Sequence, residues 1–86
     1  MAELKVSVVS ADREVWSGAA RQIVARTTEG EIGILPGHEP ILAILATGEV
    51  RVTTVSGEVI TAKADGGFFS VEHDTVTVLA GQASIV

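Results

Sequence analysis

Two glutamates and a histidine, Glu29, Glu31 and His38, lie close enough along this sequence to suggest shared chemistry. Glu29 and Glu31 are two positions apart, so an extended chain would place both carboxylates on one side, as a general acid/base pair requires. No serine or cysteine nearby stands in a nucleophile motif, and no group of aromatic residues indicates a pocket. We therefore favour a solvated or partner-facing acidic edge over a catalytic site.

The glycines of the same stretch, Gly30, Gly33 and Gly37, resemble a phosphate-binding loop only in part. Such a loop needs a following Lys and a Ser or Thr to hold phosphates and Mg²⁺, and neither is present. The flanking glutamates would also repel an anion, so we expect no ATP binding. His38 and His73 have no cysteine companions, and a four-ligand metal site would have to use carboxylates. We expect no metal and no cofactor.

Length and composition limit the possible functions further. The chain has 86 residues, which fits one domain, residues 1–86. It has no cysteine and a net charge of -5. Without disulfides, a partner would help to stabilise so small a core. Lys and Arg are scattered, so nucleic-acid binding is not expected. The N-terminus resembles neither a secretory signal nor a transit peptide. The longest apolar run, Ile41–Ala46, is far shorter than the ~20 residues that span a bilayer, so membrane association would have to go through another protein.

Valine, isoleucine and threonine recur with a period of two, the pattern of strands with one buried face. The sequence therefore predicts an all-β fold. Strands are expected at Leu4–Val8, in two short pieces between Val15 and Arg26, and at Gly48–Val55, Glu58–Asp65, Phe68–Val71 and Thr75–Leu79. Gly18 indicates a bend or bulge. The run Glu39–Ala46 fits a buried strand or a helix, and we favour the strand because the run is short for a helix.

Several segments between these strands are expected to be turns. Ser56-Gly57 predicts a two-residue hairpin connection, because glycine tolerates the positive φ of the primed turns. Glu72-His73-Asp74 predicts a second hairpin, with Gly66-Gly67 as the turn before it, and Ala11-Asp12-Arg13 predicts a turn after the first strand. Many short strands at this spacing indicate a β-sandwich or barrel.

Phe68 and Phe69 are adjacent, so a strand would direct them to opposite faces. We expect one of them to enter the core and the other to need cover from a strand neighbour or a partner. Trp16, the only tryptophan, is expected to pack with its N–H at the edge of the core, with an interface anchor as the alternative. The phenylalanine pair is the clearest physical indication of an interface.

Three blocks of the sequence together resemble the N-terminal β-sandwich domain of the epsilon subunit of bacterial F-type ATP synthases. The central block is Thr28–Pro40, a small-residue tip followed by Pro, His and Pro. Val8–Arg13 with Trp16-Ser17-Gly18 is similar to the family's opening strand and bulge, and Asp65-Gly66-Gly67-Phe68 with Val76–Ala80 to its closing hairpin. The resemblance spans essentially the whole chain. It implies a flattened β-sandwich of about ten short, mostly antiparallel strands.

The resemblance also implies a role: a non-catalytic rotor subunit of a bacterial proton-translocating ATP synthase, at the cytoplasmic face of the plasma membrane. Such a subunit links the gamma subunit to the ring of c subunits. The tip would meet the polar loops of the c ring, with these candidate contacts: Glu29, Gly30, Glu31, Ile32, Gly33, Pro36 and His38. Complementary charge would fix the register of this contact. The opposite sheet surface, including one of Phe68 and Phe69, would meet gamma.

Members of this family usually continue into two C-terminal helices, whereas this sequence ends at Ala83-Ser84-Ile85-Val86. The inhibition and nucleotide binding attributed to those helices are therefore not expected of these residues. Two other interpretations remain. The chain could be a β-sandwich interaction module of another complex, which would leave the tip block unexplained, or a small enzyme or metal protein that gathers Glu29, Glu31 and His38 in a concave site.

Overall fold

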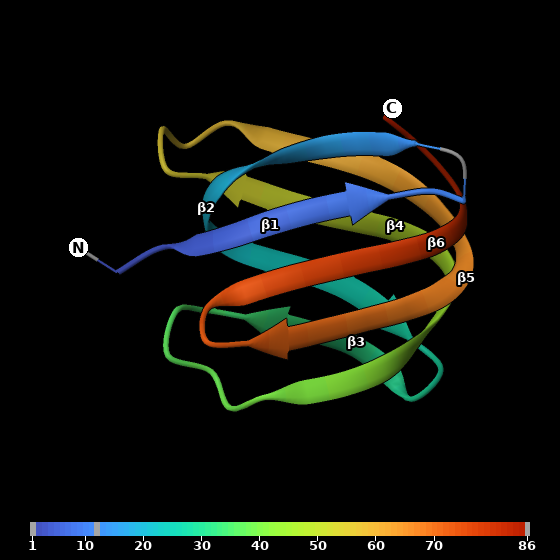
Figure 1. The fold of residues 1–86 in the computed structure, drawn as a ribbon, viewed down its shortest axis with the longest axis horizontal. Helices are drawn as coiled ribbons and strands as arrows, with labels where there is room; N and C mark the ends of the chain where they lie inside the picture. Colours follow the sequence, from blue (N-terminus) through green and yellow to red (C-terminus); the bar gives the residue numbers. More distant parts are fainter. Residues whose placement is uncertain (1, 12, 86) are drawn as a thin grey trace.

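The computed structural model describes residues 2–11 and 13–85, which form a closed arrangement of six strands (Figure 1). The strands are β1 (Leu4–Val9), β2 (Glu14–Thr27), β3 (Gly30–Ile34), β4 (Ile41–Thr54), β5 (Val59–Glu72) and β6 (Thr75–Ile85). Their order is β1-β6-β5-β4-β2-β3, and β1 also pairs with β2, which closes the sheet on itself. In Figure 1, β1, β6 and the end of β5 face the viewer, the start of β2 lies above β1, and the second half of β2 runs behind them.

The predicted all-β fold with mostly antiparallel strands is confirmed, and only β1 and β6 pair in parallel among the described strands. The expected number of about ten strands is wrong, because three of the six strands have 14 residues each. The described residues include no helix, and hence none long and apolar enough to cross a membrane.

The difference in strand number arises at glycines that lie within bent strands. Gly66 and Gly67 were expected to form a turn, yet β5 continues through both, with φ of 70° and 112°. A Cβ on Gly67 would overlap the carbonyl oxygen of Leu79 in β6, so only glycine allows the two backbones to approach this closely. β4 likewise continues from Ile41 through Gly48, which joins two predicted strands into one.

β2 is also a single strand where two short ones were expected. Its pairing with β1 shifts between Val8 and Val9, whereas Gly18 stays in register with Val6. Gly18 instead makes room for the indole ring, because a Cβ there would lie 3.0 Å from Cζ2 of Trp16. Trp16 is partly buried and packs against the core, as one of the two interpretations predicted.

Both predicted hairpins are present. β4 and β5 are joined by Val55–Glu58, so the connection has four residues rather than two, and Gly57 adopts φ 95°. β5 and β6 are joined at His73 and Asp74, which both have positive φ, at 50° and 60°. Asp12 of the predicted turn Ala11-Asp12-Arg13 lies outside the described residues, but the amide of Ser10 donates to the carbonyl of Arg13 at 2.8 Å.

The core consists mainly of small aliphatic side chains from the inward faces of the six strands. Its largest fully buried members are Phe69, Leu4, Ile23, Ile34, Val6, Val8, Val50, Val52, Val71, Val76 and Val78. A core of this kind leaves the outward residues of the same strands available for contacts with other proteins.

Candidate functional site

The predicted tip is a strand at the edge of the sheet followed by a turn. Gly30–Ile34 forms β3, which pairs only with β2 and ends the strand order. Glu29 lies in the turn before β3, and Leu35–Pro40 connects β3 to β4. Gly30–Ile34 of the predicted tip is therefore a strand and not a loop. We call Glu29–Pro40 the edge segment.

Glu31 projects from the outer face of β3 and forms an ion pair with Arg51 of β4. The Arg51 Nη2 to Glu31 Oε2 distance is 3.5 Å, and both side chains are about half exposed, at 49% and 54%. Arg26 of β2 pairs with Glu31 in the register. The Arg26 side chain lies over Gly48 of β4, where a Cβ would be 3.1 Å from Cδ of Arg26. Arg26, Glu31, Glu49 and Arg51 line one hollow on this face. We call these four residues the charged strip.

A tight turn holds the other end of the edge segment. The amide of His38 donates to the carbonyl of Leu35 at 3.3 Å, and Gly37 adopts φ 88°, as expected of a type II turn with Pro36 in its second position. His38 donates from Nδ1 to the carbonyl of Glu39 at 2.7 Å. The amide of Gly37 donates to Oδ1 of Asp74 at 2.7 Å, which joins this turn to the β5–β6 hairpin.

The structure does not gather the residues of the proposed enzyme site. Glu29 precedes β3 and His38 follows it, and a strand of this length separates its ends by about 13 Å. Among the residues that the structure describes, no group of three His, Cys, Asp or Glu side chains is arranged to hold a metal ion. Glu29, Glu31 and His38 therefore follow an edge of the sheet and do not converge on one point.

Phe68 and Phe69 face opposite sides of β5, as predicted. Phe69 is fully buried, at 0% exposure, so it is not available to a partner, whereas Phe68 is 51% exposed. Phe68 pairs with Ile44 of β4 on one side and Leu79 of β6 on the other, and Leu79 pairs in turn with Val9 of β1. We call Val9, Leu79, Phe68 and Ile44, together with Leu42, the apolar row.

The apolar row is the feature that the sequence pattern did not reveal. Residues 41–46 do form a strand, but this strand is not buried on both faces, because Leu42 is 73% exposed and Ile44 is 57% exposed. A monomeric protein rarely exposes adjacent large apolar side chains without a functional reason. The sequence feature that could have indicated the row is Phe68, whose large apolar side chain was expected to need apolar neighbours. Alternation within one strand does not show which residues of the adjacent strands those neighbours are.

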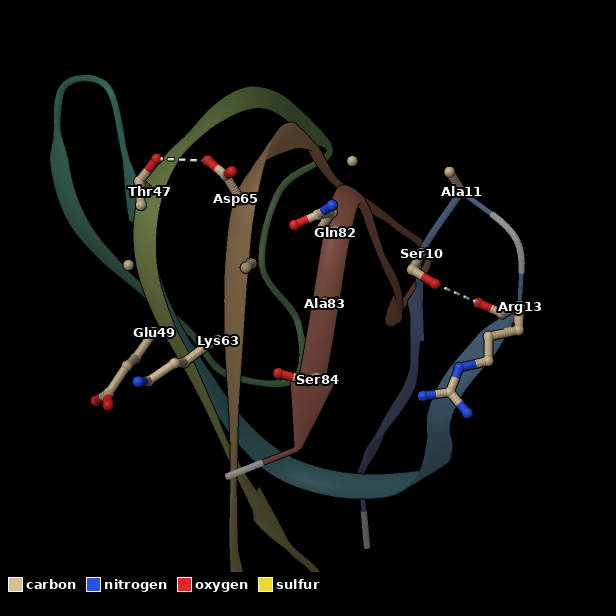
Figure 2. Close-up of a pocket in the computed structure, with 13 residues that line it drawn as sticks. Ser10, Ala11, Arg13, Thr47, Glu49, Lys63, Asp65, Gln82, Ala83 and Ser84 are labelled. Carbon is tan, nitrogen blue, oxygen red and sulfur yellow. Dashed lines mark hydrogen bonds between the residues drawn. The ribbon is translucent and has the colours of Figure 1, made fainter.

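A larger hollow of about 930 Å³ lies where β4, β5 and β6 bend (Figure 2). Thr47 donates from Oγ1 to Oδ1 of Asp65 at 2.8 Å across its upper part, and Lys63 and Glu49 lie side by side below. Arg13 approaches from the β1–β2 connection on the opposite side. The hollow is lined by charged side chains of both signs. None of the site residues predicted from the sequence lines it.

Comparison with known proteins identifies one family over nearly the whole chain. Residues 3–86 match the family model described as ATP synthase, Delta/Epsilon chain, beta-sandwich domain. The chain is 58% identical over 85 residues to the ATP synthase epsilon chain of Micrococcus luteus, covering 99% of this chain and 93% of that protein. It is 50% identical over 86 residues to the epsilon chain of Rhodococcus jostii, covering 99% of this chain and 70% of that protein.

Solved structures agree with this match. A chain in the cryo-EM structure of the Euglena gracilis mitochondrial ATP synthase, which contains OSCP, F1 and the c-ring, superposes with a TM-score of 0.92 and 28% sequence identity. The match covers 99% of this chain and 54% of the Euglena chain, so this sequence spans about half the length of that relative. A chain of the Tetrahymena thermophila enzyme shares the fold, with a TM-score of 0.75 and 19% identity.

Proposed function

This chain belongs to the family of ATP synthase delta/epsilon-chain β-sandwich domains, and we propose that it links the gamma subunit to the c ring in the rotor of a bacterial ATP synthase. The observation that carries the proposal is the presence of two chemically different outer surfaces. The apolar row lies on β1, β6, the end of β5 and the start of β4. The edge segment lies on β3 and its flanking turns, and the charged strip beside it continues onto β2 and the second half of β4. A subunit that bridges two partners requires two such surfaces.

The apolar row is the proposed contact with gamma. Ile44, Phe68 and Leu79 are exposed and in register across three strands, and half-buried Val9 extends this surface to a fourth. Burial of the surface would help to stabilise a small core. Phe68 lies within the row and presents the largest side chain, so it is the expected anchor residue. This narrows the expectation from the sequence, in which either Phe68 or Phe69 could have met gamma.

The edge segment is the proposed contact with the c ring. Its candidate contacts remain those proposed from the sequence: Glu29, Gly30, Glu31, Ile32, Gly33, Pro36 and His38. Glycines let another backbone approach closely, and Pro36 limits the conformational entropy lost on docking. Glu31 and His38 are the proposed polar contacts with basic loops of the ring, and Arg51 holds the Glu31 carboxylate in place before docking.

The proposed role is mechanical and not catalytic. The chain belongs to the membrane-associated ATP synthase complex, and we place it at the cytoplasmic face of the bacterial plasma membrane, held there by its protein partners. The separation of Glu29 from His38 along β3 supports the absence of acid/base chemistry at the edge segment. We expect no ATP binding by these residues, and calorimetric titration with ATP and Mg²⁺ tests this expectation directly.

The test of gamma binding compares two exposed apolar residues. Phe68→Glu places a charge in the apolar row, whereas Val59→Glu places one at a residue of similar exposure, 56%, next to the β4–β5 hairpin. Both variants should fold with little change in stability, because both side chains face solvent. Tagged chain recovered from solubilised bacterial membranes should lose gamma only in Phe68→Glu. Equal recovery of gamma with both variants would exclude the apolar row as the contact.

The test of the ring contact is the double substitution Glu31→Ala with His38→Ala. The isolated chain should keep nearly its full stability, since Glu31 is exposed, His38 is only partly buried, and the bonds of both lie at the surface. Proton-coupled ATP synthesis in membrane vesicles should decrease, and Glu58→Ala, at the β4–β5 hairpin, is the control that should not. Unchanged coupling would contradict the assignment, and a chain that copurified with neither gamma nor c would favour an interaction module of another complex.

A further inference from the structure

The β5–β6 hairpin turns through two residues for which the backbone conformation is unfavourable. His73 and Asp74 have φ of 50° and 60°. Both values are positive, as in a type I′ turn, where Asn-Gly and Asp-Gly are preferred because a Cβ is disfavoured at positive φ. Glycine in either position would relieve this conflict. Asp and His adopt positive φ more readily than most other non-glycine residues, so the turn tolerates both, but its geometry does not require a carboxylate at position 74.

Asp74 makes two contacts that join three segments of the chain. Its carboxylate Oδ1 accepts a hydrogen bond from the amide of Gly37 at 2.7 Å, and its carbonyl accepts one from the amide of Lys5 at 2.8 Å. Lys5 lies at the start of β1, and Gly37 lies in the turn beside His38. A glycine at 74 would retain its carbonyl and lose the carboxylate, so the bond to Gly37 is the contact that depends on the side chain.

The bond from Asp74 to Gly37 has no equivalent within the turn of residues 35–38. The other hydrogen bonds recorded for this turn are local, from the His38 amide to Leu35 and from the His38 ring to Glu39. The Gly37–Asp74 bond crosses 37 positions of the sequence. It ends on the hairpin residue directly before β6, the strand that carries Leu79 of the apolar row.

We propose that Asp74 is a positioning residue that fixes the Leu35–His38 turn to the β5–β6 hairpin and so connects the c-ring surface to the gamma surface. The proposal rests on the proposed function of these two surfaces. A turn held in its docked geometry loses less conformational entropy on binding than a free one. When Asp74 is replaced, the two surfaces remain but the hydrogen bond that connects the turn to the hairpin is lost.

Three substitutions separate this role from a role in folding. Asp74→Gly removes the acceptor and relieves the positive φ. His73→Gly relieves the positive φ at the neighbouring position and keeps the acceptor, so it is the matched control. Asp74→Asn retains an oxygen that can accept from Gly37, and asparagine tolerates positive φ. If Asp74 only supported the fold, both glycine variants would behave alike.

The first measurement is amide hydrogen exchange at Gly37 in the isolated full chain, followed by nuclear magnetic resonance. Asp74→Gly should accelerate exchange at Gly37 by about tenfold, the effect of losing one hydrogen bond of ordinary strength. His73→Gly and Asp74→Asn should stay within about twofold of the unmodified chain. Unchanged exchange at Gly37 in Asp74→Gly, or equal acceleration in His73→Gly, would overturn the proposal.

The second measurement is proton pumping per ATP hydrolysed in membrane vesicles that contain the complete enzyme. Asp74→Gly should lower this ratio, and both His73→Gly and Asp74→Asn should retain it. If Asp74→Gly accelerates exchange but leaves the ratio unchanged, while Glu31→Ala with His38→Ala lowers it, the positioning role is wrong and the proposed function stands. If neither substitution lowers the ratio, the proposed c-ring contact fails.

Discussion

The bend of β5 and the edge segment are both rich in glycine, but the two regions need glycine for different reasons. At the bend, a Cβ on Gly67 would overlap the carbonyl oxygen of Leu79 and lie 2.8 Å from Cα of Ala80. In the edge segment, a Cβ on Gly30 or Gly37 would have nothing within 4 Å. The bend is closed by the chain's own backbone, whereas the edge segment is open to another molecule. Glycine content alone does not distinguish the two cases.

The largest effect should come from Gly67→Ala at the bend. The added methyl group would collide with β6 backbone in a region of positive φ, so we expect destabilisation of about 3–5 kcal/mol from overpacking and backbone strain together. A chain of this size has a total stability of about 4–13 kcal/mol. Urea unfolding followed by circular dichroism measures the change.

The neighbouring glycine provides the control for that substitution. Gly66 also has positive φ, at 70°, but a Cβ there would have nothing within 4 Å. Gly66→Ala should therefore destabilise by only about 1–2 kcal/mol, the effect of the backbone conformation alone. If the two alanine variants were equally stable, positive φ would be the reason for glycine at both positions, and close packing against β6 would not be.

The comparison also shows how far the sequence could predict this fold. Alternation located both hairpins and predicted strands within β1, β2, β4, β5 and β6, because one face of each is buried, but it did not predict β3. The pattern predicted a turn at Gly66-Gly67 and a bend or bulge at Gly18. In the sequence, a glycine that leaves room for a neighbouring strand or for the Trp16 ring cannot be told apart from a glycine that forms a turn. This is why the pattern divided β2, β4 and β5 into shorter strands, whereas the number of about ten strands came from the family resemblance.

The candidate site was predictable to a similar degree. The opposite directions of Phe68 and Phe69 follow from strand geometry, and the structure confirms them. The apolar row did not follow, because Ile44, Phe68 and Leu79 meet only through the pairing of three strands. The family resemblance supplied the proposed partners, and it could not show that Glu31 pairs with Arg51 across β2.

An intermediate effect is expected from Gly37→Ala in the edge segment. Gly37 has φ 88° and open space around it, so alanine should destabilise the isolated chain by about 1–2 kcal/mol through its backbone conformation. Thermal unfolding measures this change. An effect as large as that of Gly67→Ala would mean that the edge segment is packed as tightly as the bend, which would remove the contrast between them.

A smaller effect of opposite sign is expected from Gly33→Ala. Gly33 lies inside β3 without positive φ, and a Cβ would only come within 3.9 Å of Cγ2 of Val24. Alanine should therefore stabilise the isolated chain by about 0.5–1 kcal/mol, because glycine inside a strand loses more backbone entropy on folding. Urea unfolding gives the sign. Destabilisation would show that the chain itself requires Gly33, and the edge segment would then be less open than we infer.

The smallest effect should come from the Glu31–Arg51 ion pair in the charged strip. Both side chains are about half exposed and 3.5 Å separates their charged atoms, so water and salt weaken their attraction. A double-mutant cycle with Glu31→Gln and Arg51→Met should give a coupling energy of about 0.5 kcal/mol or less, and 1 M NaCl should reduce it further. The cycle is measured by urea unfolding of the four chains.

A coupling energy of about 2 kcal/mol that persisted in salt would mean that the fold depends on the Glu31–Arg51 ion pair. Glu31 would then be a poor candidate for leaving Arg51 to bind a basic loop of the c ring. A weak coupling leaves the Glu31 carboxylate positioned yet available, which is what a docking contact at the open edge requires.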